Sequence, residues 1–311
     1  MTAPSALAEQ SLVVPVTDLM QPGRIMRHLE ELKQPVDAIA TPLPMWNRQC
    51  RDEGGGVGLA MGWHVIVAGS TGHGKSLMAL NMAAAAIKAG ECVAFMSLEM
   101  STAQLGSRLY AILTDTDVRM LERGNAPPAE VERKLCKIHE TTGGRFLTNE
   151  QPVFEISRIQ AQLRYWAEEK GARLFFVDYL QLATSRDAES LYREVSNISS
   201  QIREFAKRLN VVTVGLSQMN RQTSVDRSNS PMAQGLIGSS SLENDSDQVV
   251  LLDHSRYERG GDRTAKTFAL LSKNRHGGQV EIPIEWDYRT LQVRQALPDE
   301  EGEWPKRNGR R

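Results

Sequence analysis

Cysteine is scarce in this chain of 311 residues, and long apolar runs are missing. The three cysteines, Cys50, Cys92 and Cys136, lie far apart and form no C-x-x-C pair. This spacing argues against a disulfide framework and against a zinc site, and it is typical of proteins in a reducing cytoplasm. No apolar run reaches the roughly 18 residues of a membrane span, and no charged region precedes an apolar one at the N-terminus. We therefore predict neither a membrane span nor a signal peptide.

A net excess of charge is also missing. The 37 lysines and arginines nearly balance the 38 aspartates and glutamates, which leaves a formal net charge of −1 at pH 7. No global basic field favours nucleic acid, so any contact with it must be local and shared between subunits. Hydrophobic residues make up 41% of the chain. That share is enough for a sizeable core, in one large domain or two small ones.

A strand, a glycine-rich loop and a helix are predicted in succession over residues 65–87. Val65 to Ala68 is a short apolar run with β-branched residues, as in a buried strand. The eight residues after it fit the phosphate-binding pattern G-x-x-x-x-G-K-S/T. The residues expected to bind a nucleotide are Gly69, Ser70, Thr71, Gly72, His73, Gly74, Lys75, Ser76 and Leu77. Leu77 begins an apolar pattern at helical spacing, and Gly90 is a stop signal for that helix.

Each part of this loop suits the binding of a nucleoside triphosphate. Glycines let backbone N–H groups turn toward phosphate oxygens, and the helix N-terminus adds its positive dipole end. Lys75 is expected to neutralise the β- and γ-phosphates, and the Ser76 hydroxyl to bind Mg²⁺. The alternative is a glycine-rich turn that fits by chance, and the strand before it and the helix after it argue against this. We therefore predict a nucleotide site with Mg²⁺.

Polar residues follow three further predicted strands. These strands cover residues 92–96, 174–177 and 211–216, and the polar residues after them are Glu99, Asp178 and Gln218. Asp178 is expected in the Mg²⁺ coordination shell. Glu99 lies where a water-activating base is wanted, although a partner for the dipole of the next helix is the simpler interpretation. Gln218 is suited to bond a γ-phosphate, with a solvent-facing strand end as the alternative.

The C-terminal third is predicted to close the sheet. Strands are expected over residues 249–252 (parallel), then 264–272, 280–286 and 291–293 (antiparallel), with a turn at Gly277-Gly278. Lys273 and Arg275 flank one residue at a strand end and therefore point the same way. A solvated hairpin tip is the usual meaning of such a pair. Residues 219–241 form a long loop with Arg221 and Arg227, and a loop of this length is functional or disordered.

The remaining segments organise the chain. Helices are predicted from Leu105 to Ile112 after a Ser101–Gln104 capping box, around residues 129–139, and over residues 156–166 and 191–209. An amphipathic helix from Asp18 to Lys33 either folds back or docks on a neighbouring subunit. Residues 36–60 are expected to be irregular. The predicted organisation is a lead with a docking helix and loop over residues 1–60, an α/β domain over 61–297, and a disordered polar tail over 298–311.

Five segments in this order resemble the DnaB-type replicative DNA helicases. They are residues 69–76, Ser97-Leu98-Glu99-Met100-Ser101, Val177-Asp178-Tyr179-Leu180-Gln181-Leu182, Leu216-Ser217-Gln218-Met219-Asn220-Arg221 and Lys273-Asn274-Arg275. The similarity spans residues 55–295. It implies a RecA-like P-loop ATPase domain with a mainly parallel sheet. Such a domain works with ATP and Mg²⁺ as a homohexameric ring that moves 5′ to 3′ on single-stranded DNA and separates the duplex.

The resemblance also implies roles for individual residues. Glu99 would be the catalytic base, Gln218 would couple the γ-phosphate to the DNA loops, and Lys273 and Arg275 would reach into the neighbouring subunit's site. Lys75, Ser76 and Asp178 keep the phosphate and metal roles argued above. The residues expected at DNA are Arg221, Arg227, Gly238, Ser239 and Ser240.

Two departures from the family pattern bear on partners. Residues 1–60 are too few for the helical N-terminal domain that binds primase in the family, so a loader or primase partner stays open. Ile237 replaces an arginine that helps to hold the DNA backbone, which leaves backbone N–H groups and serine hydroxyls for that task. Two alternatives remain: a RecA- or KaiC-like ATPase that assembles without unwinding, and a non-enzymatic ring subunit. The intact Glu99 and Asp178 argue against the second.

Overall fold

The computed structural model describes residues 24, 26, 30, 36–50, 58–149, 155–178, 180, 191–218, 239–260 and 264–298. The chain divides into two compact units, Met1–Asp37 and Ala38–Arg311. In the first unit Arg24, Met26 and Glu30 are helical, in agreement with the helix predicted there. The apolar stripe of that helix and the polar tail after residue 298 lie outside the described residues. Within the described part, no helix is both long and apolar enough to cross a membrane.

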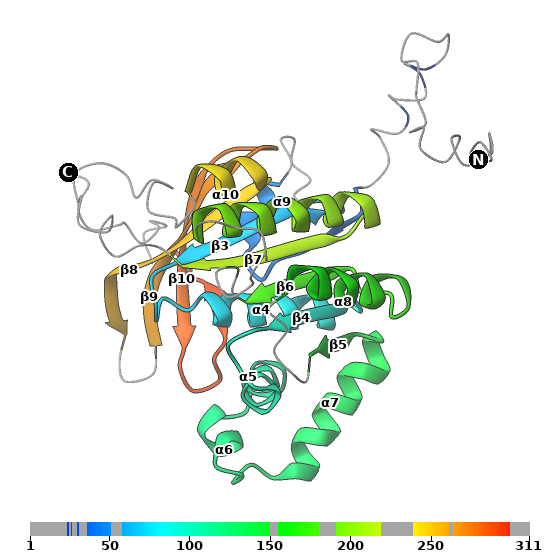
Figure 1. The fold of residues 1–311 in the computed structure, drawn as a ribbon. Coiled ribbons are helices and arrows are strands. Elements are labelled where there is room, and N and C mark those ends of the chain that lie inside the picture. Colours follow the sequence, from blue (N-terminus) through cyan, green and yellow to red (C-terminus); the bar gives the residue numbers. More distant parts are fainter. Residues whose placement is uncertain are drawn as a thin grey trace, which may run out of the picture. The chain divides into compact units, whose positions relative to one another are not determined.

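The second unit is built on a nine-stranded sheet with the order β11-β10-β9-β8-β3-β7-β6-β4-β5 (Figure 1). Its parallel part consists of β3 (His64–Gly69), β4 (Cys92–Ser97), β5 (Arg145–Thr148), β6 (Leu174–Asp178), β7 (Val212–Gln218) and β8 (Gln248–Gly260). The antiparallel part adds β9 (Thr264–Asn274), β10 (Val280–Asp287) and β11 (Val293–Gln295). The predicted strands lie in these elements, although β8 extends well past residue 252 and β11 starts only at the last residue of the stretch predicted over 291–293.

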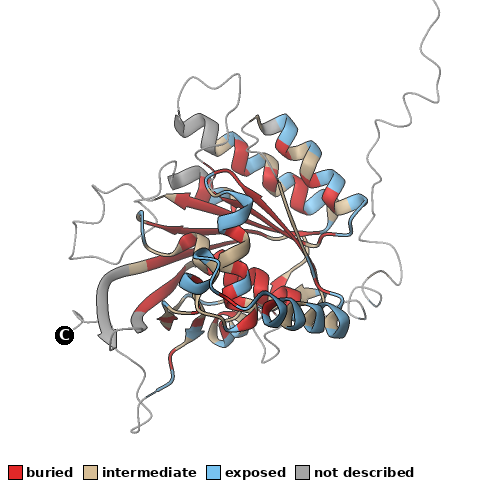
Figure 2. Ribbon diagram, turned by 90° about the horizontal axis from the view of Figure 1, so that it is seen from below, coloured by how far each residue is buried: buried red, intermediate tan, exposed pale blue. Residues whose placement is uncertain are grey.

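Helices cover both faces of the sheet, so its central strands are buried on both sides (Figure 2). Successive residues of β3 alternate between the two cores. Val65 and Val67 face α4 (Lys75–Lys88) and α5 (Thr102–Thr114). Ile66 and Ala68 face the core formed with α8 (Ile156–Glu168), α9 (Leu191–Leu209) and α10 (Ser239–Asp245). This two-sided burial explains why the strands are continuous apolar runs in the sequence.

The segment between α5 and β5 contains two helices where one is predicted. They are α6 (Val118–Glu122) and α7 (Pro128–Thr142). The Asp117 carboxylate caps α6 by accepting from the backbone N–H of Arg119 at 2.9 Å. The helix predicted around residues 129–139 corresponds to α7. Since α6 has only five residues, it cannot produce a helical periodicity, and the sequence pattern misses it.

The prediction that residues 36–60 are irregular is wrong for the described part of that stretch. It contains β1 (Ala38–Ile39), α3 (Pro44–Arg48) and β2 (Leu59–Ala60), and β1 pairs with β2. Leu43 and Trp46 are fully buried in the main core. The prolines that suggest a linker have another role, because Pro44 occupies the first turn of α3, where a missing N–H costs nothing. The compact unit therefore begins at Ala38.

Candidate nucleotide-binding site

The predicted site residues gather at one edge of the sheet. The strands β3, β7, β6 and β4 are adjacent and parallel, so their carboxyl ends lie together (Figure 1). In register, Gly69 at the end of β3 pairs with Gln218, and Ser97 at the end of β4 pairs with Asp178. Ligands of open α/β sheets bind outside the carboxyl ends of the strands. The phosphate-binding loop, Asp178, Gln218 and the Glu99 loop thus surround one position.

The loop after β3 has the backbone geometry of a phosphate cradle. Gly72 and Gly74 have φ angles of +82° and +80°, which side chains disfavour, and Gly74 is the N-cap of α4. A Cβ atom on Gly74 would lie 3.0 Å from Cη2 of Trp286, so the indole ring would have to shift for any residue with a side chain. No side chain caps α4. The first backbone N–H groups of α4 can therefore donate hydrogen bonds to a bound anion.

Lys75 is buried at the start of α4. Its Nζ donates to the carbonyl oxygens of Gly69 and Ser70 at 3.0 and 3.1 Å. Burial lowers the pKa of Lys75, and the charges of Asp178 and Glu99 oppose that change. The charges of the predicted metal ligand Asp178 and of the predicted base Glu99 therefore both act on this amine. This arrangement brings the cation for the phosphates and the two acidic residues into one site.

Asp178 and Ser76 form a pair of oxygen donors suited to Mg²⁺. Asp178 is 1% exposed, and burial is the main cause that raises its pKa to about 6. A hydrogen bond with the Ser76 side chain opposes this rise, and the Glu99 charge adds to it. Among the described residues, Asp178 Oδ2 has no hydrogen-bond partner. A buried, unpaired carboxylate oxygen beside a hydroxyl fits a hard divalent cation, whose charge favours the ionised carboxylate.

Glu99 is exposed on a loop that is fixed at several points. The backbone of Ser97 makes two bonds with the Asn149 side chain, both 2.8 Å long, and the Leu98 N–H donates to Asp178 O at 2.8 Å. The predicted capping box of Ser101 and Gln104 is confirmed and starts α5 directly after the loop. Sequence reasoning missed Asn149. It lies 52 residues from its partner in no recognisable pattern, so no local signal identifies it.

Lys273 and Arg275 lie at the opposite edge of the sheet from the phosphate loop. Arg275 follows Asn274, which pairs with Gln248 at the start of β8, and Gln248 in turn pairs with Val65 near the start of β3. The Lys273 amine donates to the carbonyl oxygens of Glu243 and Ser246. Burial, with the Arg275 charge, lowers the pKa of Lys273. The structure thus does not bring this pair to the nucleotide site of its own chain.

The predicted DNA contacts fall mostly outside the described residues. Arg221, Arg227 and Gly238 belong to residues 219–238, which the structure does not describe. Ser239 and Ser240 are the first two residues of α10. Their role in DNA binding stays a prediction.

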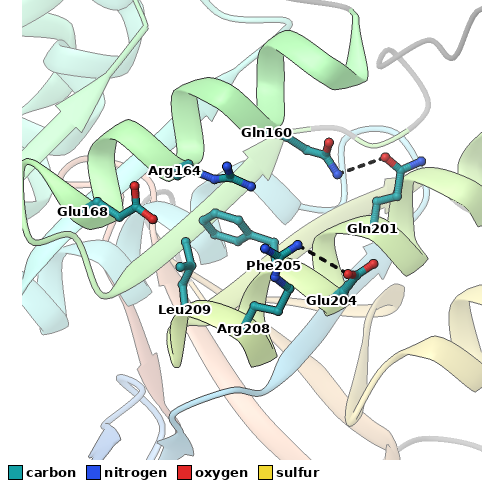
Figure 3. A pocket seen from close by; sticks show the side chains of 8 residues that line it. All are labelled: Gln160, Arg164, Glu168, Gln201, Glu204, Phe205, Arg208 and Leu209. Atoms are coloured by element: carbon teal, nitrogen blue, oxygen red, sulfur yellow. Dashed lines mark hydrogen bonds and ion pairs between the residues drawn. The ribbon is translucent and has the colours of Figure 1, made fainter. Parts of the chain in front are cut away.

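A groove between α8 and α9 lies apart from these residues (Figure 3). Gln160 donates to Gln201 at 2.9 Å across it, and Arg208 pairs with Glu204 at 3.6 Å. The described residues that line it are Gln160, Arg164, Glu168, Gln201, Glu204, Phe205, Arg208 and Leu209. None of them is a predicted site residue, so the groove is not part of the nucleotide site.

A family comparison agrees with this geometry. Residues 56–295 match the model of the DnaB-like helicase C-terminal domain. The chain belongs to this family. The match contains every predicted nucleotide, metal and catalytic residue of the DnaB-like chain, from Gly69 to Arg275.

Relatives of the DnaB-like chain are replicative helicases by name. A probable plasmid replicative DNA helicase of Chlamydia psittaci is 31% identical over 232 residues, which are 74% of this chain and 50% of that protein. The replicative DNA helicase DnaB of Leifsonia xyli subsp. xyli is 31% identical over 230 residues, or 73% of this chain and 50% of the relative. This chain therefore spans about half the length of the relatives that it matches.

Two solved structures share the fold of the DnaB-like chain. The first, described as an ATPase domain, superposes with a TM-score of 0.72 at 20% identity, over 88% of this chain and 96% of that one. The second, described as a DnaB-like replicative helicase and its interactions with primase, gives a TM-score of 0.74 at 20% identity, over 93% of this chain and 70% of that one. The predicted RecA-like α/β fold is confirmed.

The buried carboxyl group of the DnaB-like site gives an expected pH dependence of stability. The folded pKa of Asp178, about 6, exceeds its ordinary value of 3.8, so between these values the folded state binds the proton more tightly than the unfolded state. Without nucleotide or Mg²⁺, the contribution of Asp178 to the free energy of unfolding should fall as pH rises through this window, by on the order of 3 kcal/mol. Asp178→Asn should remove this pH-dependent contribution to the free energy of unfolding.

Urea unfolding at about pH 4 and pH 7 measures this contribution. Asp178→Asn should gain stability relative to the wild type as pH rises, while Asp115→Asn, at a side chain 68% exposed, should follow the wild-type profile. Identical pH profiles of stability for wild type and Asp178→Asn would show that ionisation of the Asp178 carboxyl group does not destabilise the folded state.

Proposed function

We propose that this chain is an ATP-dependent DNA helicase motor that works as a homohexameric ring on single-stranded DNA. The observation that carries the proposal is the division of one catalytic set between two edges of the sheet. Lys75, Ser76, Asp178 and Glu99 lie at the carboxyl edge, and Arg275 lies at the amino edge. A site with all five residues exists only where the carboxyl edge of one chain meets the amino edge of another. Head-to-tail contacts of this kind form a ring where the rotation between subunits closes and a filament where it does not, and the closed form is the one proposed here.

The chemistry assigned to the site is hydrolysis of the γ-phosphate of ATP. Backbone N–H groups of residues 69–77 and the Lys75 amine hold the phosphates, while Ser76 and Asp178 hold Mg²⁺. Bound Mg²⁺ would neutralise charge on the β- and γ-phosphates. The oxygen of a water molecule attacks the γ-phosphorus as its bond to the ADP oxygen breaks, and Glu99 accepts the proton that the water loses. The products are ADP and inorganic phosphate.

Coupling to DNA is assigned to the segment that follows β7. Gln218 pairs in register with Gly69, the first residue of the phosphate loop, and directly precedes residues 219–238. A bond from Gln218 to the γ-phosphate would be lost on hydrolysis, and its loss would reach this segment directly. Arg221, Arg227, Gly238, Ser239 and Ser240 are proposed to contact the DNA backbone there. A DNA substrate and three free cysteines suit the reducing cytoplasm.

A forked DNA substrate tests the proposal. With ATP and Mg²⁺ the protein should separate the strands, single-stranded DNA should stimulate hydrolysis, and the native mass should be six times the 34.6 kDa of one chain. Lys75→Ala is the matched control, because it removes the phosphate-binding amine, and it should neither bind ATP nor unwind DNA. An ATP hydrolysis rate that does not change with single-stranded DNA, or assembly of the protein into filaments, would instead favour a RecA- or KaiC-like ATPase that assembles without unwinding.

A further inference from the structure

A chain of hydrogen-bonded polar side chains, buried at Trp46 and Gln248 and half-buried at Asn274, runs from α3 to the turn that carries Arg275. The indole Nε1 of Trp46 donates to Gln248 Oε1 at 2.8 Å, and Gln248 Nε2 donates to Asn274 Oδ1 at 3.1 Å. Trp46 and Gln248 are both 0% exposed. Three side chains that are far apart in the sequence, from α3, β8 and β9, are thereby linked in series.

Asn274 fixes the backbone of the turn at the end of this chain. Its Oδ1 accepts from the His276 N–H at 3.2 Å, and its Nδ2 donates to Gly278 O at 3.1 Å and to Gln49 O at 2.6 Å. The turn is pressed against the C-cap of α3, because a Cβ atom on Gly277 would lie 2.1 Å from Gln49 O. The turn and the end of α3 therefore behave as one packed unit.

The opposite side of the turn is held as well. The Arg275 N–H donates to Asp247 O at 3.0 Å, and the His276 ring stacks on Trp63 with centroids 4.5 Å apart and planes within 10°. The Arg275 side chain is nevertheless 38% exposed, with Nη2 bonded to Asn244 O at 2.5 Å and Nη1 3.7 Å from the Asp247 carboxylate. The backbone is fixed while the guanidinium remains accessible from outside.

We infer that Gln248 and Asn274 are positioning residues for Arg275, and that Trp46 anchors them. The inference rests on the proposed role of Arg275 in the neighbouring subunit's site. A group that stabilises transferred charge must be placed to within about 1 Å, and an error of that size costs on the order of 10²-fold in rate. An amide network whose central member, Gln248, is fully buried and hydrogen-bonded at both its oxygen and its nitrogen supplies such rigidity. The family match begins at residue 56, so the anchor on α3 comes from a segment outside the matched domain.

Gln248→Leu is the direct variant, because leucine is similar in size and lacks the amide. ATP binding should be retained, while hydrolysis should fall by about 10- to 100-fold. Thr213→Val is the matched control. It also removes a buried polar contact, the 2.9 Å bond to His64 Nδ1 on a neighbouring strand, without touching the turn. Its hydrolysis rate should stay at the wild-type level. Trp46→Phe, which removes the indole N–H together with part of the ring, replaces Gln248→Leu if that variant does not fold.

Mixed rings separate positioning from loss of fold. Gln248→Leu keeps a working site and lacks a well-placed arginine, so mixing with Lys75→Ala, which keeps its Arg275 turn, should restore hydrolysis. Mixing with Arg275→Ala should restore nothing, since neither partner supplies a placed arginine. A mere folding defect would not distinguish the two partners. Wild-type hydrolysis by Gln248→Leu, or the same response to both partners, would overturn the inference.

The reference mixture of Lys75→Ala with Arg275→Ala identifies the cause of a failure. Suppose that this mixture regains hydrolysis, but Gln248→Leu responds equally to both partners. The positioning role is then wrong, and the proposed function stands. If the reference mixture itself regains no hydrolysis, Arg275 does not act in the neighbouring subunit's site. The positioning role is then overturned as well.

Discussion

Arg275→Ala should bind ATP normally and hydrolyse it about 10³- to 10⁵-fold more slowly, a loss of roughly 4–7 kcal/mol of transition-state stabilisation. The reason is the charge that builds on the transferred phosphoryl group, which a preorganised arginine stabilises. Steady-state hydrolysis and nucleotide binding, measured separately, distinguish this loss from loss of the site. Arg275→Lys should recover little, because lysine lacks the planar fork of the guanidinium.

The location of Arg275 predicts that this effect is intermolecular. Arg275 lies beyond the level of Val65, and Gly69 lies four residues further along β3, about 13 Å away at roughly 3.3 Å per residue. That separation is more than an arginine side chain spans, so Arg275 cannot reach the phosphates of its own chain. A rate effect of the expected size therefore requires the site of a neighbour.

Mixing Arg275→Ala with Lys75→Ala checks the direction of action. Some interfaces in mixed rings join an intact phosphate loop with an intact Arg275, so hydrolysis should exceed the sum of the two separate variants. Arg294→Ala is the control on an exposed arginine, 69% exposed and paired with Glu285 at 3.2 Å, and it should leave hydrolysis unchanged. If mixed rings form but regain no ATP hydrolysis at any mixing ratio, Arg275 acts only within its own subunit.

The part of the site that the sequence predicts is the part set by local chemistry. The phosphate loop needs glycines at fixed positions, and Gly72 and Gly74 have the positive φ angles that explain this need. Buried parallel strands need continuous apolar runs, and β6 ends at Asp178 as predicted. These constraints act over a few residues, so they leave a pattern that a single sequence reveals.

The part that the sequence does not predict depends on contacts between distant segments. Asn149 lies 52 residues from Ser97, and Trp46 lies 202 residues from Gln248, yet each pair meets at 2.8 Å. Neither pair leaves a periodic trace, because tertiary packing alone brings its members together. The same limit explains the error over residues 36–60, where Trp46 is a core residue within a stretch whose prolines suggest a linker.

Loop placement favours the catalytic-base interpretation of Glu99 over the helix-dipole interpretation, both of which the sequence leaves open. A partner for the helix dipole would need only to lie near the start of α5. The structure adds that Glu99 follows the strand next to Asp178, on a backbone tied to Asn149 and to Asp178 O, and that its charge acts on Lys75 and Asp178. An exposed carboxylate held beside the carboxylate that is proposed to bind Mg²⁺ suits a base that takes a proton from water.

Glu99→Gln should therefore retain ATP binding and lose about 10²- to 10⁴-fold in hydrolysis rate, because an amide cannot accept the proton. Single-turnover hydrolysis, with ATP binding measured in parallel, isolates the chemical step. Glu122→Gln, at an exposed position of α6, serves as the control and should hydrolyse ATP at the wild-type rate. If Glu99 only served the helix dipole, the substitution would cost about 0.3–1 kcal/mol of stability and leave hydrolysis intact. Near wild-type hydrolysis by Glu99→Gln would thus transfer the role of base to another residue.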